Sequence, residues 1–147
     1  MTGLYVVGIA LVLALGFGLY RKAVDGRVRA VRATPASPLG LDQDLGRTAT
    51  FVQFSSAVCA PCRVTARVLD EVSASTDGVA HIEIDAEQRL DLVGELGITR
   101  TPTVLVLDGS GVVRSRMVGA PRRQDVLAAL AGLAAVGPSM NTNPAAA

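Results

Sequence analysis

The sequence predicts an α/β domain, a central mixed sheet flanked by helices, that one transmembrane helix precedes. Strand-like segments and segments with helical spacing alternate between residues 47 and 136, and such alternation is typical of α/β sheets. Ahead of them, residues 3–20 form an apolar run without a single charge. The chain has 147 residues, which is enough for one ordinary hydrophobic core.

The apolar run reads GLYVVGIALVLALGFGLY. As a helix it would be roughly 27 Å long, close to the hydrocarbon core of a bilayer at about 30 Å. Two other interpretations remain open. A cleaved signal peptide would carry a positive segment before the run and small residues after it, and a core helix would be shorter or show a polar stripe. We expect residues 1–20 to be a membrane anchor.

The charges that follow this run predict its orientation. Five of the fourteen Lys and Arg residues lie between Arg21 and Arg32, and Asp25 is the only acidic residue among them. Positive flanks stay on the cytoplasmic side, so we expect a single-pass membrane protein with a cytoplasmic domain and the lipid membrane as a partner. The net charge of +1 gives no electrostatic case for a nucleic-acid partner.

Composition predicts the remaining boundaries. Residues 21–46 combine cations with prolines, glycine and small polar residues, so we expect a linker without packed structure. The domain is expected over residues 47–136, and residues 137–147 have nothing to bury and are expected to be a disordered tail.

Within the domain, periodicity predicts each element in turn. β-rich or alternating segments predict strands at 49–54, 81–85, 103–108 and 112–118. Apolar residues at helical spacing predict helices at 64–73, 88–96 and 124–133, the second of them ended by Gly97. The tight Gly-Ser-Gly turn at 109–111 makes the last two strands an antiparallel hairpin.

Both cysteines of the chain lie in the segment Cys59-Ala-Pro-Cys62, at the predicted junction of a strand with a helix. Unpaired N–H groups at the start of a helix favour a thiolate on Cys59, and Cys62, one turn further in, is near enough to attack a mixed disulfide. A zinc site would need about four ligands, and the chain adds only His81, so we expect no metal. A structural disulfide over so short a loop would stabilise little.

Four segments in register resemble the thioredoxin family. They are Phe54 before the CAPC segment, His81-Ile-Glu-Ile-Asp85, Gly97-Ile-Thr-Arg-Thr-Pro-Thr103, and Asp108-Gly-Ser-Gly followed by Val118-Gly-Ala120. The similarity extends over nearly all of residues 47–135. It implies the thioredoxin fold, with the central sheet of that family.

The resemblance also implies roles for individual residues. Cys59 would be the nucleophile that forms a mixed disulfide and Cys62 the thiol that resolves it, so that the dithiol itself is the redox group and no cofactor is needed. The peptide bond between Thr101 and Pro102 would be cis and would face the disulfide. The residues expected to border the substrate groove are Thr101, Pro102, Gly119 and Ala120.

Several positions depart from the family pattern. Val58 and Ala60 stand where the family has Trp and Gly. Gln53 stands where the family has a buried Asp that handles the proton of the inner cysteine, and His81 stands where it has a Lys. Because Gln does not titrate and His does, we hypothesise that His81 or a water relays the proton of Cys62. A histidine without a role is the alternative.

These observations predict a membrane-tethered thiol–disulfide oxidoreductase that reduces protein disulfides. Its electron donor would be a thioredoxin-reductase-like protein or a membrane thiol donor. One alternative is an extracytoplasmic protein of the cytochrome-maturation type, although the interval of about forty residues between Cys62 and Pro102 leaves no room for the additional element that such proteins usually carry. The other alternative is a non-catalytic thioredoxin-like binding module, which would not need both cysteines.

Overall fold

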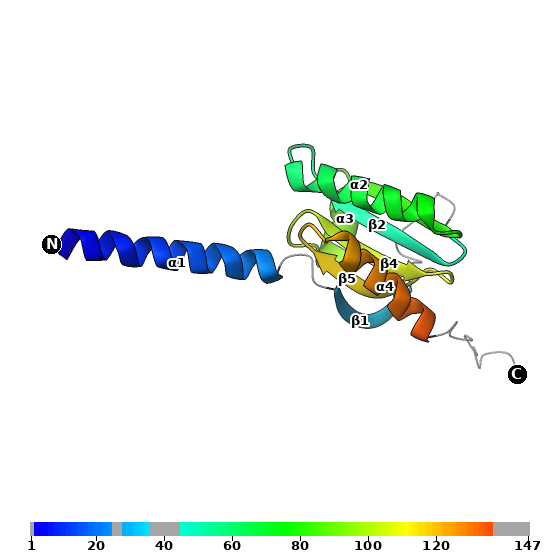
Figure 1. The fold of residues 1–147 in the computed structure, drawn as a ribbon. Helices are drawn as coiled ribbons and strands as arrows, with labels where there is room; N and C mark the ends of the chain where they lie inside the picture. The colour runs from blue at the N-terminus through cyan, green and yellow to red at the C-terminus, as the bar shows by residue number, and fades with distance from the viewer. Residues whose placement is uncertain (1, 25–27, 36–44, 137–147) are drawn as a thin grey trace, which may run out of the picture.

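The computed structural model describes residues 2–24, 28–35 and 45–136. The elements of the chain, labelled in Figure 1, are α1 (Thr2–Val24), β1 (Val28–Pro35), β2 (Ala49–Ser55), α2 (Ala60–Ser75), β3 (Val79–Asp85), α3 (Leu90–Glu95), β4 (Thr103–Asp108), β5 (Val112–Val118) and α4 (Arg123–Val136).

The centre of the fold is a five-stranded sheet in the order β1-β5-β4-β2-β3. β2 and β3 are parallel, and all other neighbours are antiparallel. The parallel pair requires a crossover connection, which α2 supplies. All seven residues of β2 are buried, in agreement with its place between two other strands. The predicted α/β architecture with a mixed sheet is confirmed.

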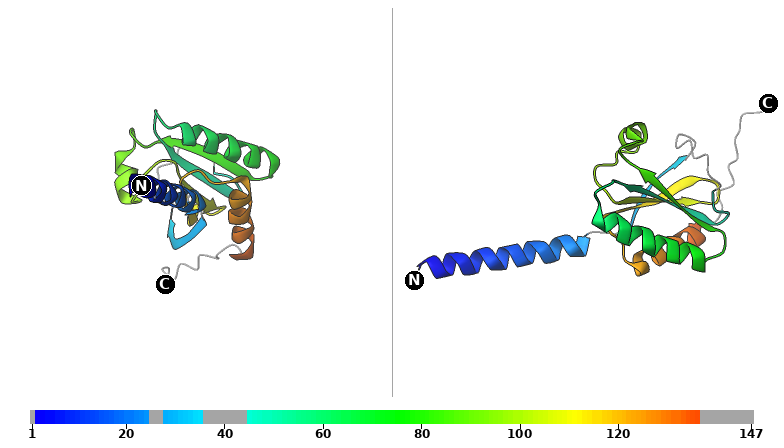
Figure 2. Two further views of the ribbon diagram at one scale, coloured as in Figure 1. Left: turned by 60° about the vertical axis from the view of Figure 1, so that its left-hand side comes forward. Right: turned by 90° about the horizontal axis from the view of Figure 1, so that it is seen from above.

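Side chains alternate between the two faces of the sheet and form a separate core on each. On one face Phe51 of β2 packs with Leu69 and Val72 of α2 and with Val126 of α4. On the other face the core includes Leu92 of α3. Figure 2 shows the same arrangement, with α2 and α4 covering one face and α3 the other. The CAPC segment therefore enters the layer that α2 and α4 share.

The predicted strands and helices are present, with shifted ends. β4 and β5 have the predicted bounds, and β3 begins two residues earlier than expected. α2 begins at Ala60 instead of residue 64, so that most of the CAPC segment belongs to the helix. Pro61 is compatible with this earlier start, because the N–H that proline lacks has no partner in the first turn of a helix.

The predicted transmembrane anchor is wrong. No helix in the described part of the chain is both long and apolar enough to cross a membrane. The single-pass membrane location that rested on this anchor is corrected with it.

β1 is an element that the sequence analysis did not predict. It lies in the stretch expected to be a linker, and it forms an edge of the sheet by antiparallel pairing with β5, from Val28 opposite Met117 to Pro35 opposite Val112. The described edge strand on the other side of the sheet is β3. The predicted disordered tail, residues 137–147, lies outside the described residues.

Candidate active site

Cys59 and Cys62 form a disulfide at the beginning of α2, with their Cα atoms 5.2 Å apart. Cys59 is the N-cap residue of the helix, and its Sγ accepts a hydrogen bond from the backbone N–H of Cys62 at 3.2 Å. This hydrogen bond uses one of the N–H groups that a helix start leaves without an intrahelical partner. A negative charge that develops on Cys59 Sγ would be stabilised by the same N–H group.

The two cysteines differ in their access to solvent. Cys59 is 7% exposed and Cys62 is 2% exposed, so Cys59 is the more accessible residue of the pair. We expected Cys59 to be exposed, and in the disulfide form it is the more accessible of the two but still buried. Val58, directly before it, is 98% exposed and offers an apolar contact at the position of the family's Trp.

Two further loops meet the one that carries the cysteines. The hydroxyl groups of Ser56 and Thr101 lie 3.2 Å apart, and the bond between Thr101 and Pro102 is cis, as predicted. The N–H of Gly119 donates to the carbonyl of Pro102 at 2.8 Å. Gly119 has a φ of 88°, a backbone conformation that favours glycine. That these residues and Ala120 border a substrate groove stays a prediction.

Gln53 lies beneath the cysteines, fully buried on β2. Its Nε2 donates to the carbonyl oxygen of Cys62 at 3.1 Å and to Oε1 of Glu83 at 3.1 Å. It also lies 2.7 Å from the hydroxyl oxygen of Ser55, which itself donates to the same Glu83 oxygen. Gln53 therefore contacts the inner cysteine through the backbone carbonyl of Cys62.

His81 lies on β3, but the described residues do not join it to Gln53 by a hydrogen bond. Its Nδ1 lies 2.7 Å from a carboxylate oxygen of Asp70 on α2, and its side chain is 7% exposed. In the register of β2 and β3, His81 stands beside Phe51, whereas Gln53 stands beside Glu83. The proton relay that the sequence suggested through His81 thus has no hydrogen-bonded connection to the cysteines here.

Sequence reasoning missed Ser55 and Glu83. Both lie one or two residues from positions that the sequence analysis examined. Their proximity to Gln53 depends on the register between β2 and β3, which cannot be read from the sequence. The signal available was the alternation in β3, since Glu83 is polar between the buried residues Ile82 and Ile84. Among the described residues no group of three or more His, Cys, Asp or Glu side chains is arranged to hold a metal ion.

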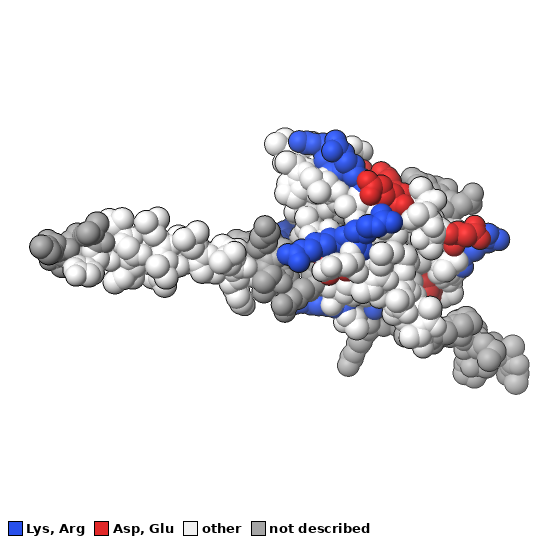
Figure 3. Space-filling model, viewed as in Figure 1, with Lys and Arg blue, Asp and Glu red and all other residues white. Residues whose placement is uncertain are grey.

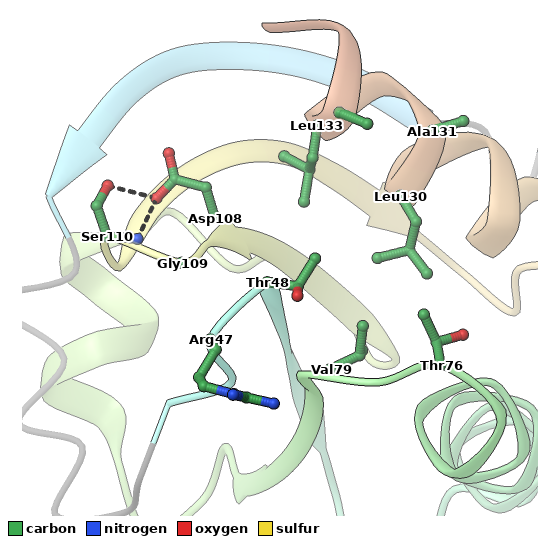
Figure 4. A pocket seen from close by; sticks show the side chains of 11 residues that line it. Arg47, Thr48, Thr76, Val79, Asp108, Gly109, Ser110, Leu130, Ala131 and Leu133 are labelled. Carbon is green, nitrogen blue, oxygen red and sulfur yellow. Dashed lines mark hydrogen bonds between the residues drawn. The ribbon is translucent and has the colours of Figure 1, made fainter. Parts of the chain in front are cut away.

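A pocket of about 700 Å³ lies at the opposite end of β2, and it does not belong to this site. Figure 4 shows Leu130 and Leu133 of α4 facing Val79 across it, with Arg47 and Thr48 at one side. Thr48 lies directly before β2, and Cys59 lies in the loop and helix start that follow its other end. A seven-residue strand extends about 20 Å, so the pocket and the disulfide are separated by about the length of β2. A ligand in this pocket would not contact the disulfide.

Comparisons with known proteins agree with the geometry. The family model described as Thioredoxin matches residues 41–132. Thioredoxin 2 of Chlorobaculum tepidum is 34% identical over 71 residues, which are 48% of this chain and 64% of the relative. The thioredoxin of Chlorobaculum thiosulfatiphilum is 32% identical over 81 residues, 54% of this chain and 71% of the relative.

Solved structures show the same similarity. The crystal structure of chloroplastic thioredoxin z is 25% identical to this chain and superimposes with a TM-score of 0.54, covering 60% of this chain and 80% of the other. The match to the Chlorobaculum tepidum relative spans less than two thirds of that protein's length. The residues that the family model matches include β2 to β5, α2, α3 and the cysteine pair, but not β1.

Proposed function

Because the chain belongs to the thioredoxin family, we propose that it is a thiol–disulfide oxidoreductase that exchanges disulfides with protein substrates through Cys59 and Cys62. The observation that carries the proposal is the disulfide at the N-terminus of α2, where the N–H of Cys62 donates to Cys59 Sγ. A purely structural crosslink over so short a loop would add little stability.

In the reduced protein, the Cys59 thiolate attacks one sulfur of a substrate disulfide. The substrate S–S bond breaks, a mixed disulfide forms on Cys59, and the first substrate thiol leaves with a proton from solvent. Cys62 then loses its proton to solvent and attacks Cys59 Sγ, which forms the Cys59–Cys62 disulfide and releases the second substrate sulfur as a thiolate that takes up a proton from solvent. The dithiol is oxidised by two electrons and the substrate disulfide is reduced to two thiols.

We assign the direction as reduction, with a thioredoxin-reductase-like protein as the electron donor. The relatives that support this direction are thioredoxins. The three loops at the disulfide, which carry Ser56, Thr101 and Gly119, would border an extended segment of the substrate. Val58 would supply apolar contact beside the reactive sulfur.

The test is reduction of a model protein disulfide with dithiothreitol as the donor. Cys59→Ser should lower the catalysed rate by at least about a hundredfold, because it removes the attacking sulfur. Cys62→Ser should instead accumulate a mixed disulfide on Cys59, visible by mass spectrometry and released by excess reductant. Ser110→Ala, in the turn at the other end of the sheet, is the matched control and should keep the wild-type rate.

A binding module would give a different result. If Cys59→Ser still captures the same partner proteins, and the wild-type protein does not accelerate reduction, then the chain holds partners without turnover and the proposal is wrong.

A further inference from the structure

The buried Gln53 amide connects the inner cysteine to a carboxylate on the neighbouring strand. Its Nε2 is 3.1 Å from the carbonyl oxygen of Cys62 and 3.1 Å from Oε1 of Glu83. These two oxygens are therefore at most twice 3.1 Å, or 6.2 Å, apart. Ser55 strengthens the connection, because its hydroxyl donates to the same Glu83 oxygen.

The orientation of this amide is fixed by its partners. A backbone carbonyl and a carboxylate only accept hydrogen bonds, so the nitrogen of Gln53, and not its oxygen, must face them. The oxygen atom Oε1 is consequently buried, without a partner among the described residues. A buried acceptor in this state costs free energy, which indicates that the contacts of Nε2 with Cys62 and Glu83 hold the amide in place.

We infer that Glu83 is a positioning residue for Cys62, and that its charge, held close by Gln53 and Ser55, sets the pH at which Cys62 resolves the mixed disulfide. The inference rests on the proposed function. A carboxylate disfavours a second negative charge nearby, and the effect is larger where burial excludes water. Cys62 is 2% exposed and Gln53 is fully buried, whereas Glu83 is an exposed residue whose contacts with Gln53 and Ser55 are partly buried. Glu83 thus raises the pH at which Cys62 loses its proton, compared with the same protein without this charge.

Other charged groups lie on the elements around Cys62, and they stay constant in the experiment below. They are Arg63, Arg67, Asp70 and Glu71 of α2, with Glu71 paired to Arg123 of α4, His81 and Asp85 of β3, and Arg100 before β4. Among the described side chains, Glu83 is the ionisable one that hydrogen-bonds Gln53.

The experiment separates the two thiol steps. Reduced protein reacts at low pH with the aromatic disulfide dithiobis(nitrobenzoate), which releases one coloured thiolate and leaves the other on Cys59. A jump to a higher pH, over a series from about pH 5 to 9, then follows release of the second thiolate as Cys62 attacks. The first release reports Cys59 and the second reports Cys62.

Glu83→Gln keeps the size of the side chain and removes its charge. We expect the midpoint pH of the second release to fall by about one unit, while the profile of the first release stays close to that of the wild type. Below the midpoint, the thiolate becomes about tenfold more abundant but less nucleophilic, so the second release should become roughly threefold faster. Glu83→Asp keeps the charge and should retain the wild-type midpoint.

Glu87→Gln is the matched control, because Glu87 follows β3 but its side chain is outside the Gln53 contacts. It should leave both profiles unchanged. Thermal unfolding of each variant checks that the fold is intact. If Glu83→Gln and Glu83→Asp move the midpoint equally, or if neither moves it, the inference is wrong. If the wild-type protein forms no mixed disulfide at all, the proposed function fails instead.

Discussion

Asp108 organises the turn between β4 and β5 through four hydrogen bonds. Its carboxylate accepts from the backbone N–H groups of Ser110 and Val112, both at 3.0 Å, from the Ser110 hydroxyl, and from Nε of Arg114 at 2.6 Å. Partial burial by itself would raise the pKa of Asp108, but the hydrogen bonds from Ser110, Val112 and Arg114 outweigh it and lower the pKa below the ordinary 3.8. The side chains of Asp108 and Arg114 are each 17% exposed.

Asp108→Asn should lower the free energy of unfolding by about 1–3 kcal/mol at neutral pH, because the partly buried ion pair with Arg114 is lost and an amide nitrogen must face a donor. The pKa is lower in the folded state, so the contribution of Asp108 is present above the unfolded pKa and is lost as pH falls through the folded pKa. Urea unfolding should therefore show the difference between wild type and variant shrinking below about pH 4.

The control for this prediction is Asp77→Asn. Asp77 pairs with Arg47 at 3.2 Å, but both side chains are almost fully exposed, so the substitution should leave the urea midpoint unchanged. A difference between wild type and Asp108→Asn that stays constant from neutral to acid pH would contradict the assigned cause.

At the scale of elements, β1 contributes an edge strand whose value can be measured. Five residue pairs join it to β5, and cross-strand pairs contribute about 0.2–1 kcal/mol each. Removing residues 1–44 should therefore lower the free energy of unfolding by about 1–4 kcal/mol relative to a chain that lacks only residues 1–27. Arg29 stands opposite Arg116, and such like charges favour the lower end of this range.

Chemical unfolding of the two shortened chains, monitored by circular dichroism, measures the effect. Because both lack α1, the comparison isolates β1 and the segment after it. Equal midpoints would show that the pairing with β5 adds nothing to stability.

The sequence predicted the strands of the sheet interior and did not predict β1, for a physical reason. β4 reads TVLVLD, a short run rich in β-branched and other apolar residues, which is typical of a buried strand. β1 reads VRAVRATP, in which two arginines and a terminal proline resemble a linker, yet charged residues and proline are common in edge strands.

At the active site, too, the sequence predicted some of the contacts and not others. The place of Cys59 and Cys62 followed from their spacing at a strand-to-helix junction, and the structure confirms it. The partner of Gln53 did not follow, because a shift of the β2–β3 register decides whether Glu83 or His81 stands beside it. Such pairing between strands is a property of the folded sheet, and only the structure displays it.

At the scale of the whole molecule, arginines gather at the end of the sheet that carries the disulfide. Each of the three loops at this end has an arginine in it or next to it. These arginines are Arg63 after Cys62, Arg100 before Thr101 and Arg122 after Gly119. Figure 3 shows blue side chains, which are arginines here, over the beginning of α2, with Asp and Glu further along it. Glu87, after β3, is an opposing charge at this end.

If the proposed function holds, peptide disulfides flanked by Asp and Glu should be reduced about three- to tenfold faster than peptides flanked by Lys and Arg at low ionic strength. Added salt should reduce the ratio, because exposed charges are screened over about 10 Å at 0.1 M. The double substitution Arg63→Glu with Arg122→Glu should invert the preference. Arg47→Glu, at the other end of β2, should not change it, and an equal effect of both would contradict a local cause.

The pairing of β1 with β5 also has a consequence for how the chain is made. Val28 and Met117 are neighbours in the sheet but stand 89 positions apart in the sequence. At about 5–20 residues per second, the ribosome needs roughly 4–18 s to supply the second strand after the first. During synthesis the first strand therefore waits without its hydrogen-bonding neighbour, and the sheet is completed at this edge only after β5 has been synthesised.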